Sequence, residues 1–247
     1  MTHKIPQKRG KAMIILAFDS TAKAASVAIS DDERLLANYT IDNGLTQSEL
    51  LLPMAENMLK SLKLTFSDVS LLAVSVGPGS FTGVRIGTAL VKGISFGKDI
   101  PCIALSTLDG LCENIAGLQG VLVPCMDARR NQVYTATYMS DGSDIRKLTE
   151  DRAIPIEQLA NELKEYENQP IYLVGDGYKS TKNALTELGV KTENTPELLL
   201  NENAFSLCKL AYRKYKAGEY TTDTAIIPTY LRMPQAERER LERLKNN

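Results

Sequence analysis

The hydrophobic and polar positions of the first half of the chain predict a sheet covered by helices. A short apolar run, Met13–Asp19, ends in an acid and predicts a buried strand. Two alternating runs, Ala24–Ser30 and Glu33–Ile41, are separated by two aspartates and predict a hairpin. Apolar residues then recur at helical spacing over Ser48–Leu62, which predicts a helix.

A glycine-rich stretch follows, VSVGPGSFTGVRIGTALVKG, at the junction between an apolar strand and a helix. We predict the strand over 71–77, the helix over about Val84–Gly97 and a further strand over 101–106. The second half repeats this order of elements: an apolar run that ends in Asp127, an alternating strand up to Met139, a helix near Ile156–Tyr166, a strand over 171–177, and helices over 180–188 and 202–217.

This repeat predicts two copies of one β-β-β-α-β-α unit, and therefore an α/β fold of mixed sheets flanked by helices. The copies are offset by about a hundred residues and share the order of elements but little residue identity. We divide the chain into an N-terminal lobe at 13–106 and a C-terminal lobe at 107–233. We expect a flexible basic leader at 1–12 and a solvated charged tail at 234–247.

The composition argues against several classes of protein. The formal net charge of −1 gives no general attraction to nucleic acid or to an anionic membrane. Aromatic residues make up 6% of the chain and tryptophan is absent, which disfavours an RNA-binding module built on base stacking. No stretch approaches the roughly 20 apolar residues of a membrane helix, and the leader lacks the apolar core of a signal peptide. We therefore expect a cytoplasmic protein.

The cysteines and the histidine argue against a metal centre. Cys102, Cys112, Cys125 and Cys208 have no CxxC spacing and stand in apolar surroundings. They are expected to be small buried hydrophobic residues in a reducing compartment. The one histidine, His3, lies in the leader, which excludes a histidine-based metal site and a Ser-His-Asp triad in the folded part. No metal is expected.

The glycine-rich stretch matches neither of two common phosphate-binding motifs. A Walker loop needs a Gly-Lys pair that is missing here, and the glycines are spaced as GxGxxxG instead of the dinucleotide fingerprint GxGxxG. In the actin/Hsp70/sugar-kinase fold, an acid at the end of the first strand of each half is followed by a glycine and a hydroxyl residue. Asp19 and Asp127 occupy these places without the glycine, so an intact ATP site is not expected. A degenerate nucleotide or phosphate loop would consist of Asp19, Ser20, Gly77, Gly79, Ser80, Arg85 and Asp127.

Helix packing offers another explanation for the same glycines. Small residues at helical spacing flatten one face of a helix, so that another element can approach closely. That face packs either on the sheet of the chain itself or on a partner. The helix at 48–62 is apolar around most of its circumference, which favours a second buried surface. The predicted partner interface consists of Leu51, Met54, Met58, Gly83, Val84, Gly87, Thr88, Leu90, Val91 and Ile94.

Three arginines are candidates for polar roles. Arg85 stands in the first turn of an otherwise apolar helix, and we expect it to pair with Asp19 across the strand ends. Contact with a phosphate at a subunit junction is the alternative. Arg129 and Arg130 follow Asp127 and are expected in a solvated turn, with contact to a ligand or tRNA as the alternative.

Four strings of the sequence together resemble the TsaB (YeaZ) family: FDST at Phe18–Thr21, SELLLPM at Ser48–Met54, GPGSFTGVRIG at Gly77–Gly87 and PTYLRMPQAER at Pro228–Arg238. The resemblance implies two ribonuclease-H-like lobes of the actin/Hsp70 (ASKHA) superfamily, without a complete catalytic site. Members of this family are subunits of the bacterial machinery that makes threonylcarbamoyladenosine beside the tRNA anticodon.

The resemblance also implies partners and a role. A TsaB-type subunit pairs through its N-lobe helices with TsaD, which transfers the threonylcarbamoyl group, and TsaE, an ATPase, joins them. Without TsaD, a homodimer is expected through the same surface. The resemblance implies contact with tRNA through the complex only, no cofactor on the isolated chain, and ATP or ADP at the subunit junction of the complex. The expected function is that of a non-catalytic scaffold or activator of the transferase.

One departure from the relatives bears on enzymatic activity. TsaD carries a metal-binding HxxxH on the equivalent helix, whereas LTQSELLLPM holds no pair of metal ligands at that spacing. Gln47 stands where many TsaB sequences have a lone histidine. A metallopeptidase is therefore not expected. The competing hypothesis is a stand-alone ATPase or small-molecule kinase of the same fold, which would bind Mg-ATP tightly.

Overall fold

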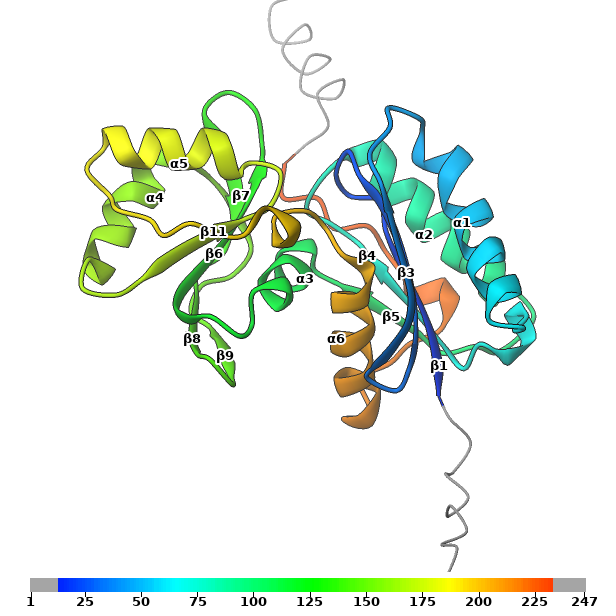
Figure 1. The fold of residues 1–247 in the computed structure, drawn as a ribbon. Coiled ribbons are helices and arrows are strands. Elements are labelled where there is room, and N and C mark those ends of the chain that lie inside the picture. The colour runs from blue at the N-terminus through cyan, green and yellow to red at the C-terminus, as the bar shows by residue number, and fades with distance from the viewer. Residues whose placement is uncertain (1–12, 233–247) are drawn as a thin grey trace, which may run out of the picture.

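The computed structural model describes residues 13–232, and these form two lobes side by side (Figure 1). The first lobe holds a mixed sheet in the order β3-β2-β1-β4-β5. Strand β1 is antiparallel to β2 and parallel to β4, as expected when a hairpin is followed by a helical crossover. The strands are β1 (Ile14–Asp19), β2 (Ala25–Asp31), β3 (Arg34–Ile41), β4 (Leu71–Ser75) and β5 (Cys102–Leu105).

Strand β1 is apolar throughout because both faces of its sheet are covered. Leu16 and Phe18 point into the core beneath helices α1 (Gln47–Ser61) and α2 (Phe81–Ser95). Ile15 and Ala17 point to the opposite face, which helix α6 (Ala204–Lys216) covers. Alternate residues of a strand face opposite sides of the sheet, so an unbroken apolar run is needed here.

The second lobe repeats this arrangement around β6 (Gln119–Asp127). Strand β11 (Ile171–Val174) pairs parallel to β6 on one side, as β4 pairs with β1. On the other side, β7 (Gln132–Thr135) and β8 (Tyr138–Asp141) continue one antiparallel register along β6. The break between β7 and β8 lies across from Pro124, which has no N–H for the ladder. The outer strands are β9 (Ile145–Lys147) and β10 (Arg152–Pro155).

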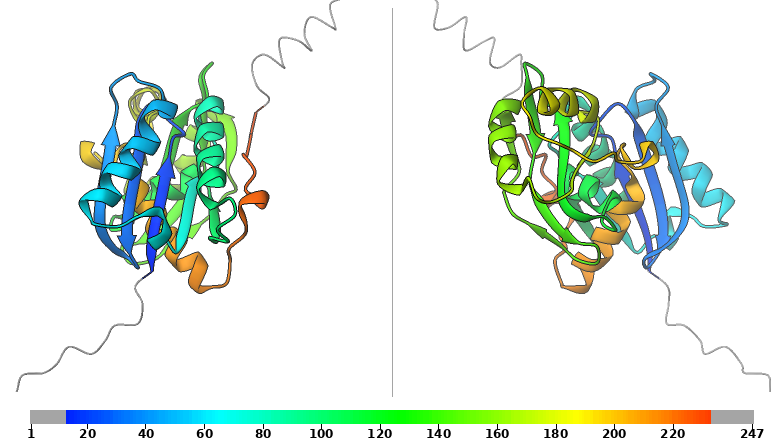
Figure 2. Two further views of the ribbon diagram at one scale, coloured as in Figure 1. Left: turned by 90° about the vertical axis from the view of Figure 1, so that its right-hand side faces the viewer. Right: turned by 60° about the vertical axis from the view of Figure 1, so that its left-hand side comes forward.

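The helices of the second lobe complete five layers. Helices α4 (Ile156–Leu163) and α5 (Tyr178–Glu187) cover its outer face, and α3 (Thr107–Asn114) covers its inner face. Helices α3 and α6 lie together between the two sheets (Figures 1 and 2). Helices α1 and α2 cover the outer face of the first sheet, on the side of the molecule opposite to α4 and α5. Short 3₁₀ helices occur at Phe66–Asp68, Lys164–Tyr166, Glu197–Leu199 and Asp223–Ala225. In the described range 13–232, no helix is long and apolar enough to cross a membrane.

The predicted order of elements is confirmed for the first lobe through β5, and the predicted α/β fold of two related lobes is confirmed. The strand order β3-β2-β1-β4 of the first lobe recurs as β10-β7-β6-β11 in the second, as in two ribonuclease-H-like lobes of the ASKHA type. The predicted boundary at 107–233 needs correction because the chain returns to the first lobe. Helix α6 packs on β1 and β2, and Ile226 is buried in the core beneath α1 and α2. Helix α3 and strands β9 and β10 were not predicted. The predictions for the leader and the tail lie outside the described residues.

Candidate functional site

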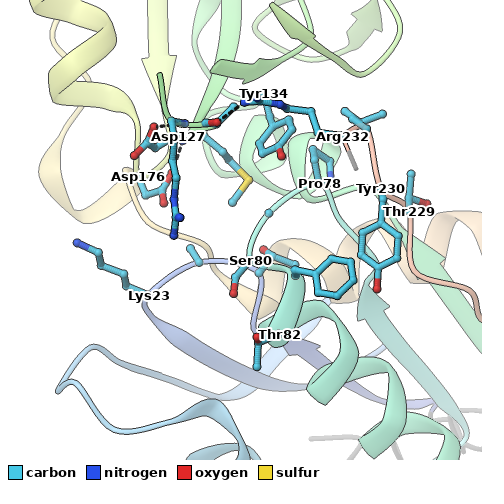
Figure 3. A pocket seen from close by; sticks show the side chains of 18 of the residues that line it. Lys23, Pro78, Ser80, Thr82, Asp127, Tyr134, Asp176, Thr229, Tyr230 and Arg232 are labelled. Carbon is cyan, nitrogen blue, oxygen red and sulfur yellow. Dashed lines mark hydrogen bonds between the residues drawn. The ribbon is translucent and has the colours of Figure 1, made fainter. Parts of the chain in front are cut away.

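The candidate site is a cleft of about 510 Å³ between the two lobes (Figure 3). Both lobes contribute to its walls, which carry acidic, basic and aromatic side chains. The first lobe supplies the turn after β1, the loop before α2 and the segment that follows Ile226; the second lobe supplies the ends of β6 and β11 and the start of β7. The lining residues that bear on the site are Thr21, Lys23, Gly79, Ser80, Phe81, Asp127, Arg129, Asp176, Thr229, Tyr230 and Arg232.

The glycines beside the cleft allow close packing within the chain itself. A Cβ on Gly83 would lie 1.8 Å from the carbonyl oxygen of Ser20, and a Cβ on Gly79 would lie 2.4 Å from that of Thr21. Both separations are far below contact distance, so only glycine fits. The Ser80 N–H also donates to the Thr21 carbonyl at 2.6 Å. The turn after β1 therefore lies directly against the glycine loop and the start of α2.

Two further glycines of the motif serve similar contacts. The Ser20 hydroxyl donates to the Gly83 carbonyl at 2.8 Å, and a Cβ on Gly87 would lie 2.5 Å from that hydroxyl oxygen. Gly77, at φ +111°, would place a Cβ 2.5 Å from the Thr229 carbonyl oxygen. The space beside the glycines that suggest a phosphate loop is thus filled by backbone and hydroxyl groups of the chain itself.

The two acids at the strand ends lie in different environments. Asp19 is buried, and its Oδ1 accepts from the Thr21 N–H at 3.0 Å and the Thr21 hydroxyl at 2.6 Å. Burial raises the pKa of Asp19, although the hydrogen bonds from Thr21 oppose this effect. Asp127 lines the cleft, accepts from the Arg129 N–H at 2.7 Å and donates its own N–H to Asp176 at 3.1 Å. The degenerate loop is therefore divided: Gly79, Ser80 and Asp127 line the cleft, and Asp19, Ser20, Gly77 and Arg85 do not.

The predicted pairing of Arg85 with Asp19 is wrong. The Arg85 guanidinium lies 3.8 Å from the centroid of the Phe81 ring, and its Nε donates to the Tyr230 hydroxyl at 2.9 Å. Phe81 and Tyr230 stack with ring centroids 4.4 Å apart. Gly83 and Gly87 lie on the side of α2 that faces the β1 turn. Arg85 is two residues from each of them, and therefore points to the other side of the helix.

The segment after Ile226 is the part of the site that the sequence analysis did not predict. The Thr229 N–H donates to the Val76 carbonyl at 2.7 Å in the first lobe, and the Arg232 guanidinium donates to the Ala128 carbonyl in the second. The segment therefore ties both lobes together at the mouth of the cleft. The signal for it is the PTYLR string, which contains Tyr230 and Arg232. Arg129 and Arg130 lie in a turn with φ near +60° and +55°, and Arg129 lines the cleft.

The residues predicted for a partner interface are mostly inside the chain. Nine of the ten are buried, and Leu90 alone among them is partly exposed. The glycine face of α2 packs on the β1 turn, and Leu51, Met54 and Met58 join the core of the first lobe. The packing alternative is therefore correct for the glycine face, and the residues proposed for a partner surface need correction. A substitution such as Val91→Arg would disrupt the core instead of a partner contact.

The opposite faces of α1 and α2 are exposed. The exposed face of α2 carries small and apolar residues, whereas that of α1 carries Leu52 among polar residues such as Glu56 and Lys60. Phe96 is 79% exposed and Leu52 is 38% exposed. Ala89 is exposed, and a Cβ on Gly93 would have no neighbour within 4 Å. This surface, defined here as the outer face of α1 and α2, includes Leu52, Ile86, Ala89, Leu90, Gly93 and Phe96.

The cysteines have the predicted character. All four are buried and free. Burial raises the pKa of each thiol, to about 12 for Cys125 and Cys208. Across residues 13–232, no group of three or more His, Cys, Asp and Glu side chains is placed to hold a metal ion.

The native protein should therefore show no reactive thiol. At about pH 8, Ellman's reagent should titrate none of the cysteines before denaturation and all four afterwards, because the thiolate is the reactive form. A thiol that reacts within seconds in the native protein would contradict this burial.

Comparisons with known proteins agree with the motifs. A family model described as TsaD: tRNA N6-adenosine threonylcarbamoyltransferase matches residues 45–240. The chain is 29% identical to the tRNA threonylcarbamoyladenosine biosynthesis protein TsaB of Bacillus subtilis, over 94% of this chain and 100% of that protein. It is 28% identical to the Escherichia coli protein of the same name, over 89% and 95%.

A solved structure agrees with these matches. YeaZ from Pseudomonas aeruginosa superposes with a TM-score of 0.73 at 26% identity, covering 89% of this chain and 100% of that chain. The chain belongs to the TsaD tRNA N6-adenosine threonylcarbamoyltransferase family, in which it groups with the TsaB (YeaZ) proteins.

Proposed function

We propose that this chain is a non-catalytic subunit that supports a TsaD-like transferase in the threonylcarbamoyl modification of tRNA adenosine beside the anticodon. The proposal rests on one observation: the chain's own backbone fills the space in the glycine loop that a phosphate would need. The Ser20–Thr21 backbone lies against Gly79 and Gly83, where a nucleotide phosphate would need room. The buried Asp19 is also hydrogen-bonded to Thr21 instead of facing the cleft. These contacts support a subunit that keeps the family fold without a phosphate site of its own.

The outer face of α1 and α2 is the surface that we assign to the transferase. The two helices lie side by side on the flank of the first lobe (Figure 1). Ala89 and Gly93 let a partner helix approach closely, and the exposed Phe96 adds apolar area at the end of the same surface. In the absence of the transferase, the same surface would pair two copies of this chain.

The remaining partners follow from the family. A TsaE-like ATPase would join the pair, and ATP or ADP would bind at the subunit junction instead of on this chain alone. The formal net charge of −1 fits a subunit that meets tRNA only through the complex. We propose a cytoplasmic location, where such a complex would meet its tRNA substrate.

Ala89→Arg should abolish the complex and leave the subunit folded. The new side chain puts a charge into the closest helix contact, where a buried unpaired charge is costly. Size-exclusion chromatography with light scattering, on the chain alone and mixed with the TsaD-like protein of the same organism, measures the outcome. The wild type should form a homodimer that gives way to a 1:1 heterodimer.

The matched control is Asn183→Arg, on the exposed side of α5 in the other lobe. It should assemble like the wild type. If Ala89→Arg also assembles normally, the assigned surface is wrong; if the wild type never binds the transferase, the proposed function is wrong.

The alternative function is a stand-alone ATPase or small-molecule kinase. The cleft of about 510 Å³ with Lys23 and Arg129 in its walls is the observation in its favour. Calorimetric titration of the isolated chain with Mg-ATP distinguishes the two. Micromolar binding would support the enzyme, and the filled glycine loop leads us to expect none.

A further inference from the structure

A buried glutamate lies where the chain crosses from the second lobe back to the first. On the second-lobe side, the Gly175 N–H donates to the Leu200 carbonyl at 2.8 Å. On the first-lobe side, the Ala204 N–H donates to the Ser26 hydroxyl at 2.9 Å. Glu202 lies between these two anchors and is only 2% exposed. It therefore occupies the joint on which the two lobes would move.

The joint gathers carboxylates from both lobes. The negative charges that act on Glu202 come from Asp19 at the end of β1, Asp176 after β11 and Asp42 after β3. Lys23, on the turn after β1, faces Asp176 across the cleft (Figure 3). The Oε1 atom of Glu202 has no hydrogen-bond partner among the described residues. A charged, unpartnered oxygen in this position would be costly.

The environment favours the protonated form of these groups. Burial, followed by the charges of Asp19 and Asp176, holds the pKa of Glu202 well above its usual range. Burial also raises the pKa of Asp19 and of Asp176. For Asp176 the hydrogen bond from the Asp127 N–H and the charge of Lys23 oppose this effect, and the negative charge of Asp127 adds to it. Lys23 acts on Asp176, whereas the charges that act on Glu202 are negative, so protonation is what neutralises Glu202.

We propose that Asp19, Asp176 and Glu202 form a proton-operated joint, which holds the lobes closed when it is protonated and opens the cleft when it is fully ionised. The closed arrangement binds more protons than an open, hydrated one. The closed population is therefore complete at low pH and falls as the pH rises through the raised pKa of the group. This inference does not depend on the identity of the partner subunit.

Energy transfer between dyes on the two flanks tests the proposal. Lys60 on α1 and Glu187 on α5 are exposed and, changed to cysteine, carry the dyes, while the four native cysteines are buried. In the full chain, transfer efficiency should be high at acidic pH and should fall as the pH rises beyond the range in which ordinary carboxyl groups ionise, because the flanks move apart as the joint ionises. Glu202→Gln keeps the shape of the side chain without the charge, so its transfer efficiency should stay high over the whole range.

Two further variants make the result specific. Glu197→Gln changes an exposed glutamate of the same crossing segment and should respond like the wild type. Asp176→Asn keeps an oxygen for the Asp127 N–H and should lose most of the pH response, which provides a second test if Glu202→Gln does not fold. A wild-type signal that does not change with pH, or an unchanged response in both joint variants, overturns the proposal.

Discussion

Gly83→Ala should cost about 3 kcal/mol or more of the free energy of unfolding, since overpacking of this kind strains the backbone. The added Cβ would lie 1.8 Å from the Ser20 carbonyl oxygen, which belongs to backbone and cannot swing aside like a flexible side chain. Either the turn after β1 or the start of α2 must move, and both are held by hydrogen bonds between Ser20 and Gly83 and between Ser80 and Thr21. Urea denaturation followed by far-UV circular dichroism measures the loss.

Gly93→Ala in the same helix provides the matched control. A Cβ at Gly93 would meet no atom of this chain within 4 Å, so in the monomer the change improves only the helix propensity. The expected gain is about 0.5–1 kcal/mol. If Gly83→Ala and Gly93→Ala have similar stabilities, the close contact between α2 and the β1 turn is not present in solution.

Ile226→Ala should cost about 2–5 kcal/mol, because it empties space in a packed core. Ile226 is fully buried in the core beneath α1 and α2, although it belongs to a segment more than 200 residues away from β1. This side chain anchors the segment that continues to Thr229 and Arg232 along the cleft. Its loss should therefore lower the stability of the first lobe and loosen the mouth of the cleft.

The neighbouring Ile227 is 70% exposed and supplies the control. Ile227→Ala should change the free energy of unfolding by no more than about 0.5 kcal/mol, as is usual for exposed positions. Thermal and urea unfolding of the two single variants measure the difference. Equal stabilities would mean that the segment after α6 does not pack on the first lobe.

Periodicity predicted most of the fold because it reports local burial. The apolar runs ending in Asp19 and Asp127 mark strands that are covered on both faces, and the helical spacing at 48–62 marks α1. Helix α3 was not predicted because it has only eight residues, about two turns, which is too short for its apolar spacing to stand out.

Contacts between distant segments were not predictable in this way. The partner of Arg85 is Tyr230, 145 residues further along the chain. Helix α2 carries apolar or small residues on both faces, so the pattern alone did not decide which face the chain itself would bury. The glycine spacing correctly indicated a close approach, and the structure shows that the approaching element is the β1 turn. The acids at the strand ends were found from sequence, whereas Glu202 gave no local signal of its proximity to Asp19.

The return of α6 to the first lobe makes that lobe discontinuous along the chain, with the second lobe inserted into it. Residues 107–200 form a continuous stretch that supplies all strands of the second sheet together with α3, α4 and α5. During synthesis, this inserted lobe is complete and can fold while one face of the first sheet still lacks α6. The first lobe is completed only when residues 204–229 emerge from the ribosome. The lobe whose helices α1 and α2 carry the assigned partner surface is therefore the last to finish folding.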